Sequence, residues 1–334
     1  MKKLLLITTG GTIASVSTDK GLAPGLQAKD ILEYVKFRKF DFELDTISLF
    51  SIDSTDIRPE HWLLIKQTIK ESYDKYDGFV ITHGTDTLAY TASALGYLIQ
   101  KSPKPIVITG AQKSISNDIT DAKNNLIDAL IFASKEKSHG VNIVFNGKVI
   151  CGNRARKVRT KSFDAFDSIN YPLIAIIHDG KVLRYIDDKS ESNVEFYNKL
   201  DESVYLLKLI PSMRADILED IFEKYDCIIV ESYGVGGMPA GISEEFLRLM
   251  EQYSTNKIIV MTTQVPQEGS DIGVYQVGMR IRENLDVLES KDMTLESVVC
   301  KMMYVMGKYN RDIQKIQDEF YSIINHDISI IEYM

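Results

Sequence analysis

The sequence predicts an α/β fold with two packed domains. Five short, continuous apolar runs each end in glycine or a small polar residue, which is typical of strands buried on both faces of a parallel sheet. These runs are Leu4–Thr9, Phe79–Thr82, Ile106–Thr109, Ile228–Val230 and Ile258–Met261. Helix-like segments separate them, and the 334 residues exceed the usual length of a single domain.

Three segments between the predicted strands have helical periodicity. In Glu60–Tyr76, apolar and aromatic side chains recur at steps of three and four, and Pro59 suits the first turn of a helix. Asp86–Gln100 and Asp118–Ser134 show the same kind of pattern. Because ligands of open parallel sheets bind beyond the carboxyl ends of the strands, we expect the small polar residues that end each strand to line the site.

A charged, non-periodic segment, residues 180–203, separates the two groups of strands. We therefore predict an N-terminal domain over residues 1–185, a linker over residues 186–203 and a C-terminal α/β domain over residues 204–334. The sequence contains no internal repeat and no low-complexity tract.

The composition narrows the function. The formal net charge of −8 argues against nucleic acid and membrane surfaces as partners. The three cysteines are widely spaced and the five histidines show no HxxxH pattern, so we expect free thiols in a reducing compartment, the cytoplasm, and no metal site. No apolar run approaches about 18 residues, and the apolar part of MKKLLLITTGG is too short for a secretory signal.

Two consecutive glycines follow the first predicted strand. Gly10 and Gly11 let the backbone turn sharply and approach a ligand closely, and Thr12 would then project its hydroxyl beyond the strand end. A plain strand-ending turn explains the same pattern, because Gly-Gly turns are common.

A second polar group, from His83 to Thr87, follows the next strand and opens a helix. Thr85 or Asp86 could serve only as the N-cap of that helix. Capping accounts for one residue, but not for a hydroxyl and a carboxylate that arrive at the same sheet edge as Thr12. Together these groups could hold an amino group and activate a nucleophile.

Three further patterns have plainer explanations. The polar cluster Asp53–Asp56 precedes the Pro59 helix and is typical of a cap or turn. The basic run Asn153–Lys161 is, taken alone, typical of a solvated surface. The glycines of Gly234–Gly241 fail the spacing of a dinucleotide-binding loop, because Pro239 stands in the place of its third glycine.

Taken together, TTGGTIAS at residues 8–15 and THGTDTLAYTASAL at residues 82–95 resemble the two signatures of bacterial-type L-asparaginases. The resemblance covers nearly the whole chain and is to the cytoplasmic type I branch of the asparaginase/glutaminase family. The other similar segments are IDSTDIRPEHW at 52–62, ITGAQ at 108–112, GNRARKVRTKSFDAFDS at 152–168 and ESYGVGGMPAG at 231–241. The resemblance implies two α/β domains, a larger N-terminal one with a mixed, mostly parallel sheet and a smaller C-terminal one with a parallel sheet.

The resemblance also implies catalytic roles. Thr12 matches the nucleophile that the substrate acylates, and Thr85, Asp86 and Lys157 match a second triad in which the lysine helps to deprotonate the threonine. A threonine alcohol is almost entirely protonated at neutral pH and needs a base. A lysine held among the arginines of the basic run would lose its proton more easily, because like charges disfavour its cationic form.

Substrate recognition follows from the same resemblance. Asp86 and Ser54 would hold the α-ammonium and the α-carboxylate of L-asparagine, and backbone N–H groups near Thr85 and Ala111 would stabilise the oxyanion, where one lost donor costs about 3 kcal/mol. The implied substrate-binding residues are Gly11, Asp53, Ser54, Thr55, Gly84 and Ala111. The family pathway releases ammonia and then aspartate without metal or organic cofactor, in a homodimer or homotetramer with active sites near the subunit interface.

Two positions depart from the family pattern. Leu22 stands ten residues after Thr12, where many members carry a tyrosine that is hydrogen-bonded to the nucleophile, and leucine cannot relay a proton. Gly237 stands where many relatives have an asparagine that reaches across the dimer interface. Each departure removes a group that the family pattern supplies.

Two other functions remain open. The asparaginase-like subunit of a tRNA-dependent amidotransferase uses related motifs, but it carries an extra N-terminal domain, whereas the first predicted strand here begins at residue 3 or 4. A protein that senses asparagine without hydrolysing it is also conceivable, because of Leu22. The selectivity between asparagine and glutamine depends on small pocket differences worth ~1–3 kcal/mol, and neither it nor a second, allosteric asparagine site can be read from the sequence.

Overall fold

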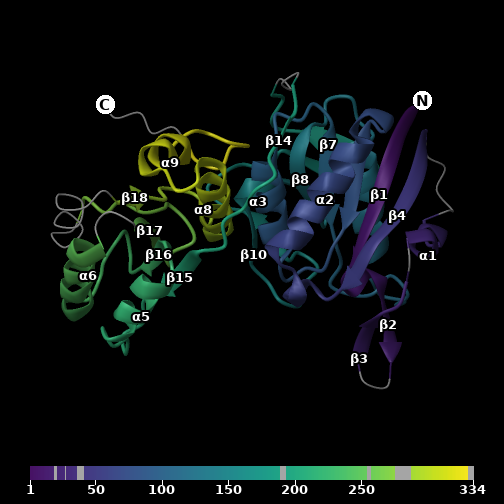
Figure 1. Cartoon of the computed structure of the whole chain (residues 1–334). Helices are drawn as coiled ribbons and strands as arrows, with labels where there is room; N and C mark the ends of the chain where they lie inside the picture. Colours follow the sequence, from purple (N-terminus) through teal and green to yellow (C-terminus); the bar gives the residue numbers. More distant parts are fainter. Residues whose placement is uncertain are drawn as a thin grey trace. The chain divides into compact units, whose positions relative to one another are not determined.

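The computed structural model describes residues 1–18, 21–26, 28–35, 41–188, 193–253, 257–274 and 287–329. The chain divides into two compact units (Figure 1). Unit 1 comprises Met1–Asn198 together with Ile324–His326, and unit 2 spans Lys199–Ile323 and continues from Asp327. Residues 189–192 of the predicted linker lie outside the described residues.

An eight-stranded mixed sheet forms the centre of unit 1, in the order β13-β12-β9-β8-β7-β5-β1-β4. Strands β4, β1, β5, β7 and β8 are mutually parallel, and β9, β12 and β13 continue the sheet in antiparallel pairs. The strands are β1 (Lys2–Gly10), β4 (Phe42–Ile52), β5 (Gly78–Thr82), β7 (Pro105–Thr109), β8 (Gly140–Phe145), β9 (Lys148–Cys151), β12 (Ala175–His178) and β13 (Lys181–Arg184). The parallel strands β5 and β7 are buried throughout, as their continuous apolar sequences predicted.

Helices cover both faces of this sheet. The helices of unit 1 are α1 (Ala28–Glu33), α2 (Pro59–Ser72), α3 (Leu88–Leu98) and α4 (Ala122–Ala133). Ile31 of α1 and Leu126 of α4 pack with Leu4, Leu6 and Val80 in one core. In Figure 1, α2 and α3 lie in front of the sheet and pack against each other. Because helices cover both faces of the sheet, a ligand can reach it only at the ends of its strands.

Three two-stranded ribbons complete unit 1. They are β2 (Ser15–Thr18) with β3 (Gly21–Pro24), β10 (Ala155–Lys157) with β11 (Phe166–Ser168), and β6 (Ile99–Gln100) with β14 (Glu195–Phe196). The first ribbon directly follows the Thr12 turn, and the second carries Lys157.

Unit 2 contains a four-stranded parallel sheet in the order β15-β16-β17-β18. Its strands are β15 (Val204–Lys208), β16 (Cys227–Ser232), β17 (Ile258–Thr263) and β18 (Leu288–Glu289), and its helices are α5 (Ile217–Lys224), α6 (Ala240–Tyr253), α8 (Leu295–Tyr309) and α9 (Ile313–Phe320). Phe222 of α5 and Phe246 of α6 meet edge to face in its core, with ring centroids 5.3 Å apart. The fold of both units confirms the predicted pair of α/β sheets, one mixed and one parallel.

All five predicted strands are present, but the helices are shorter than predicted. Helix α2 ends at Ser72, where a 3-10 turn over Tyr73–Lys75 replaces its expected last residues. Helices α3 and α4 begin at Leu88 and Ala122 rather than at Asp86 and Asp118. The polar residues before each helix are instead part of the loops at the strand ends. No helix in the described ranges has both the length and the hydropathy of a membrane span.

Candidate active site

Gly10 and Gly11 end β1 and turn the chain into the 3-10 turn Thr12–Ala14. Both glycines have left-handed φ angles, +100° and +78°. A Cβ at Gly11 would lie 2.3 Å from the backbone nitrogen of Gly84, so only glycine fits there. This close approach brings the Thr12 turn against the loop that follows β5.

The loop after β4 joins the same place. A Cβ at Gly84 would lie 2.5 Å from Ser54 Oγ. The backbone N–H of Asp86 donates to Ser54 Oγ at 3.3 Å, and the Thr87 hydroxyl donates to the Ser54 carbonyl at 2.7 Å. Three predicted segments, after β1, β4 and β5, therefore meet at one edge of the sheet.

Lys157 connects two of the predicted catalytic residues. Its Nζ donates to Thr85 Oγ1 at 2.8 Å and to Asp86 Oδ1 at 2.7 Å. The Lys157 side chain is 18% exposed, whereas that of Asp86 is 59% exposed. The amine is thus shielded from water and held between a hydroxyl and a carboxylate.

Gly11, the residue before Thr12, is the part of this turn that lies against the loop after β5. The Thr12 side chain is partly exposed, and within the described part of the chain its hydroxyl has no hydrogen-bond partner. No hydrogen bond to another described residue therefore has to break before this oxygen can contact a substrate.

Gln112 belongs to the same cluster and was not among the residues predicted from the sequence. The Thr85 hydroxyl donates to Gln112 Oε1 at 3.3 Å, and Gln112 Nε2 donates to the Ser162 carbonyl at 3.1 Å. The predicted residue beside it, Ala111, is fully buried. The sequence signal that could have identified Gln112 is its position in the loop that follows the carboxyl end of β7, next to Ala111.

Asp53 and Thr55, two of the predicted substrate-binding residues, are hydrogen-bonded to each other. Asp53 Oδ1 accepts hydrogen bonds from the backbone N–H and the hydroxyl of Thr55, both at 2.9 Å. Asp53 thereby caps the 3-10 turn Ser54–Asp56, as the polar cluster suggested. Ser54, inside that turn, is the buried member that faces Gly84.

Neither Thr85 nor Asp86 caps helix α3. The N-cap position is Thr87, whose side chain makes no capping hydrogen bond. The capping interpretation of the two residues is therefore wrong, because the helix begins later than its hydrophobic pattern suggested. Their side chains contact Lys157 instead.

His83 connects this loop to helix α3. It is fully buried, with Nδ1 2.7 Å from the Gly84 carbonyl and Nε2 3.0 Å from the Thr91 hydroxyl. Trp62 Nε1 donates to the same hydroxyl at 2.9 Å. Burial lowers the pKa of His83 to about 4, against the opposing effect of the Gly84 carbonyl. A neutral ring with its proton on Nδ1 satisfies every one of these contacts.

The basic run before and after Lys157 is not a uniform solvated surface. Arg154 is fully buried, and its Nε donates to the His326 carbonyl at 2.5 Å while its guanidinium lies over the Tyr171 ring. Arg159 forms an ion pair with Asp164 at 2.9 Å. The surface interpretation is therefore wrong for Arg154. Arg159, by contrast, is 48% exposed in its ion pair with Asp164.

The two departures from the family pattern lie in different units. In β3, the backbone of Leu22 pairs with that of Ser17. The side chain of Leu22 is not part of the described structure. Gly237 closes a turn in unit 2, where its N–H donates to the Tyr233 carbonyl at 2.7 Å.

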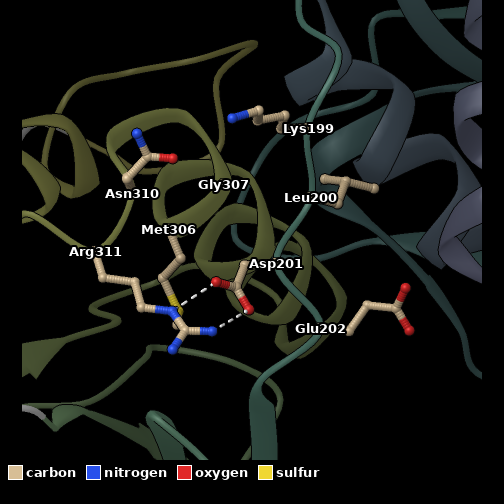
Figure 2. A pocket seen from close by; sticks show the side chains of 8 residues that line it. All are labelled: Lys199, Leu200, Asp201, Glu202, Met306, Gly307, Asn310 and Arg311. Carbon is tan, nitrogen blue, oxygen red and sulfur yellow. Dashed lines mark hydrogen bonds and ion pairs between the residues drawn. The ribbon is translucent and has the colours of Figure 1, made fainter.

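Unit 2 has a separate pocket of about 420 Å³ at the C-terminal end of α8. Figure 2 shows Arg311 beside Asp201, with hydrogen bonds of 2.8 and 3.2 Å from the guanidinium to the carboxylate. The residues that line this pocket include none of those predicted for the site. Throughout the described ranges, no group of three His, Cys, Asp or Glu side chains is arranged to hold a metal ion.

The chain matches two family descriptions in succession. Residues 3–190 match "Asparaginase, N-terminal", and residues 203–320 match "Glutaminase/Asparaginase C-terminal domain". Together these segments cover most of the chain.

Similar proteins align with more than nine-tenths of this chain. An L-asparaginase of Thermococcus kodakarensis is 39% identical over 94% of this chain and 95% of its own, and L-asparaginase 1 of Escherichia coli K12 is 31% identical over 92% of both. A glutamyl-tRNA(Gln) amidotransferase subunit of Metallosphaera sedula is 32% identical over 94% of this chain and 74% of its own. A solved structure of the thermostable Thermococcus kodakarensis L-asparaginase superposes with a TM-score of 0.91 at 37% identity, covering 98% of this chain and 100% of that one.

Proposed function

Because the chain belongs to the asparaginase family along both of its domains, we propose that it hydrolyses L-asparagine to L-aspartate and ammonia. The observation that carries the proposal is the placement of Lys157 Nζ within 2.8 Å of Thr85 Oγ1 and 2.7 Å of Asp86 Oδ1. Amide hydrolysis requires a nucleophile and a proton carrier, and this cluster lies beside the turn that presents Thr12.

In the proposed first half-reaction, Thr12 Oγ attacks the side-chain amide carbon of asparagine. The hydroxyl proton passes to Thr85, whose own proton passes to Lys157 in its neutral form. The C–N bond then breaks, and the nitrogen leaves as ammonia after taking up this proton. The product of this step is an aspartyl ester on Thr12.

In the second half-reaction, water attacks the ester and restores the Thr12 hydroxyl. The same Thr85 and Lys157 groups take a proton from water and return it to Thr12 Oγ. We assign the stabilisation of the oxyanion in both steps to backbone N–H groups near Thr85 and Ala111, in the loops that follow the adjacent parallel strands β5 and β7.

The charged ends of the substrate require partners of opposite sign. Asp86 carries a carboxylate that is more than half exposed, so it can pair with the α-ammonium while one of its oxygens holds Lys157. Ser54 Oγ, next to Gly84, is assigned to the α-carboxylate. Asp53 and Thr55 are assigned to the substrate site beside Ser54, and the hydrogen bonds between them also shape the turn that carries Ser54.

We further propose that the protein is a cytoplasmic homodimer or homotetramer, with active sites near the subunit interface. Its three cysteines are buried and form no disulfide, which suits a reducing compartment. Light scattering coupled to size-exclusion chromatography measures the assembly, and a monomeric mass with full activity would contradict it.

The direct test is ammonia release from purified protein with L-asparagine as the sole addition. Continuing heat in a calorimeter until the asparagine is consumed is expected of the enzyme, whereas a sensor gives a single binding isotherm. An amidotransferase subunit would need its partner protein and tRNA for full turnover. Failure to release ammonia from asparagine alone would overturn the proposal.

A further inference from the structure

The turn that carries Thr12 cannot hold itself in place. It is a 3-10 turn of three residues, Thr12–Ala14, and its N-cap, Gly11, supplies no side-chain hydrogen bond. The chain enters it through two left-handed glycines, which are the most conformationally free residues in the unfolded chain. Contacts from other segments must therefore fix the position of the Thr12 hydroxyl.

At the ends of the turn, the Gly11 N–H donates to the Ile52 carbonyl, and the N–H groups of Gly25 and Leu26 donate to the Ala14 carbonyl. Further contacts come from the loop after β7. Ser114 is fully buried, and its hydroxyl donates to the carbonyl of Ser15, the residue that ends the turn. The N–H of Ile115 donates to the Ile13 carbonyl at 3.3 Å. Within the turn, the Ser15 hydroxyl donates to the Gly11 carbonyl at 3.0 Å. The turn is thus bound at its middle and at its end by residues about one hundred positions away.

The loop that provides these contacts is itself anchored. The buried carboxylate of Asp121 accepts hydrogen bonds from the backbone N–H of Gln112, at 2.9 Å, and of Lys113, at 3.1 Å. The Thr120 hydroxyl donates to the Lys113 carbonyl at 3.0 Å. At its other end the same loop contacts the second threonine, through Thr85 Oγ1 and Gln112 Oε1. One short segment therefore touches both threonine loops.

We propose that Ser114 is a positioning residue for the reaction, because its hydroxyl holds the Thr12 turn at a set distance from the Thr85 and Lys157 cluster. The inference rests on the proposed function, in which Thr12 is the nucleophile. Ser114 acts on the geometry of attack and does not contact the substrate. Its loss is expected to slow acylation more than it weakens substrate binding, because a displacement of ~1 Å in a reacting group costs up to about a hundredfold in rate.

The test compares Ser114→Ala with Ser102→Ala. Ser102 is also a buried serine of unit 1 whose hydroxyl donates to a carbonyl, that of Lys104, but it lies before β7, at the opposite end of that strand from the site. We expect Ser114→Ala to lower kcat about tenfold with KM within about twofold of wild type. Ser102→Ala is expected to keep kcat within about twofold at a similar loss of thermal stability.

A second variant separates positioning from folding. Ser114→Cys keeps the branching and number of heavy atoms of the side chain, with a larger sulfur in place of oxygen, but supplies only a weak donor, so its kcat is expected to fall between those of wild type and Ser114→Ala. Wild-type kcat in both Ser114 variants would overturn the inference while leaving the proposed function intact. An inactive wild-type protein would instead overturn the proposed function.

Discussion

Lys157 Nζ lies 2.8 Å from Thr85 Oγ1, across a sequence separation of 72 residues. The antiparallel ribbon of β10 and β11 carries the lysine, and the loop after β5 carries the threonine. The contact matters because a neutral amine at this distance can take a proton from the hydroxyl without a bridging water.

Replacing Lys157 by methionine should nearly abolish turnover. Methionine keeps an unbranched side chain of similar length in the shielded site but cannot accept a proton. We expect Lys157→Met to lower kcat by about 10²–10⁴, the usual contribution of a general base, with thermal stability close to wild type. The matched control is Lys181→Met, at an exposed lysine of β13. Turnover of Lys157→Met within tenfold of the control would contradict the assigned role.

The contact of Gly11 with Gly84 makes a prediction about stability and activity together. Gly11→Ala would combine a left-handed φ with a Cβ 2.3 Å from a backbone nitrogen, so one of the two loops must move. Gly234→Ala is the matched control, because Gly234 also has a positive φ, +51°, but nothing lies within 4 Å of its Cβ position.

We expect Gly234→Ala to cost about 1 kcal/mol of unfolding free energy, from backbone strain alone. Gly11→Ala should cost clearly more and should also lower kcat, because it displaces the Thr12 turn. Urea unfolding and ammonia release measure the two effects. Equal losses of stability in the two variants, with kcat unchanged, would show that the loops are not in contact.

Burial of His83 predicts acid sensitivity. The native pKa of about 4 lies below the ordinary value of 6.5, so the unfolded chain binds a proton between these pH values and the native chain does not. The stabilisation is complete above pH 6.5 and is lost as the pH falls towards 4, by about 3 kcal/mol in total. Urea unfolding at several pH values should therefore give a flatter pH dependence for His83→Gln than for wild type. The exposed His178→Gln serves as control, and parallel curves for all three proteins would contradict the prediction.

The three thiols should be unreactive in the native protein. Cys151, Cys227 and Cys300 form no disulfide and are buried, and burial raises the pKa of the Cys227 and Cys300 thiols well above the usual range. A chromogenic disulfide reagent at pH 8 is expected to detect almost no thiol in the native protein and all three after unfolding in guanidinium. Rapid reaction of one thiol in the native protein would show that its region opens readily.

The sequence predicted best those site residues that directly follow a strand. Strands that end in Thr, Gly and Ser predicted the sheet edge at which Gly11, Ser54 and Gly84 meet, because parallel strands bring their carboxyl ends together. Lys157 carries no such local signal, since it lies on a short ribbon outside the main sheet. Only the family resemblance indicated its role.

Contacts between distant segments were the least predictable. Arg154 lies in a basic run that is typical of the surface, yet the His326 carbonyl, 172 residues away, and the Tyr171 ring allow it to be buried. Gln112 was overlooked for the same reason, because its partner Thr85 lies on another strand end. Local pattern shows which residues are polar, but not which distant partner allows them to be buried.

Loss of Thr12 and loss of Thr85 should differ in the covalent intermediate. Thr12→Ala removes the attacking oxygen, so no ester can form. Thr85→Val keeps the shape of the side chain but removes the hydroxyl that Lys157 contacts, so attack by Thr12 is slow without being prevented. Both variants should lose at least about a hundredfold in kcat, whereas Thr68→Val, on the exposed side of α2, should stay near wild type.

Mass spectrometry of the acid-quenched protein after mixing with asparagine separates the two roles. An adduct on the peptide that contains Thr12 is expected for wild type and, at longer times, for Thr85→Val. Thr12→Ala should give none. An adduct on the Thr85 peptide instead would exchange the two roles, because it would make Thr85 the residue that attacks the amide carbon.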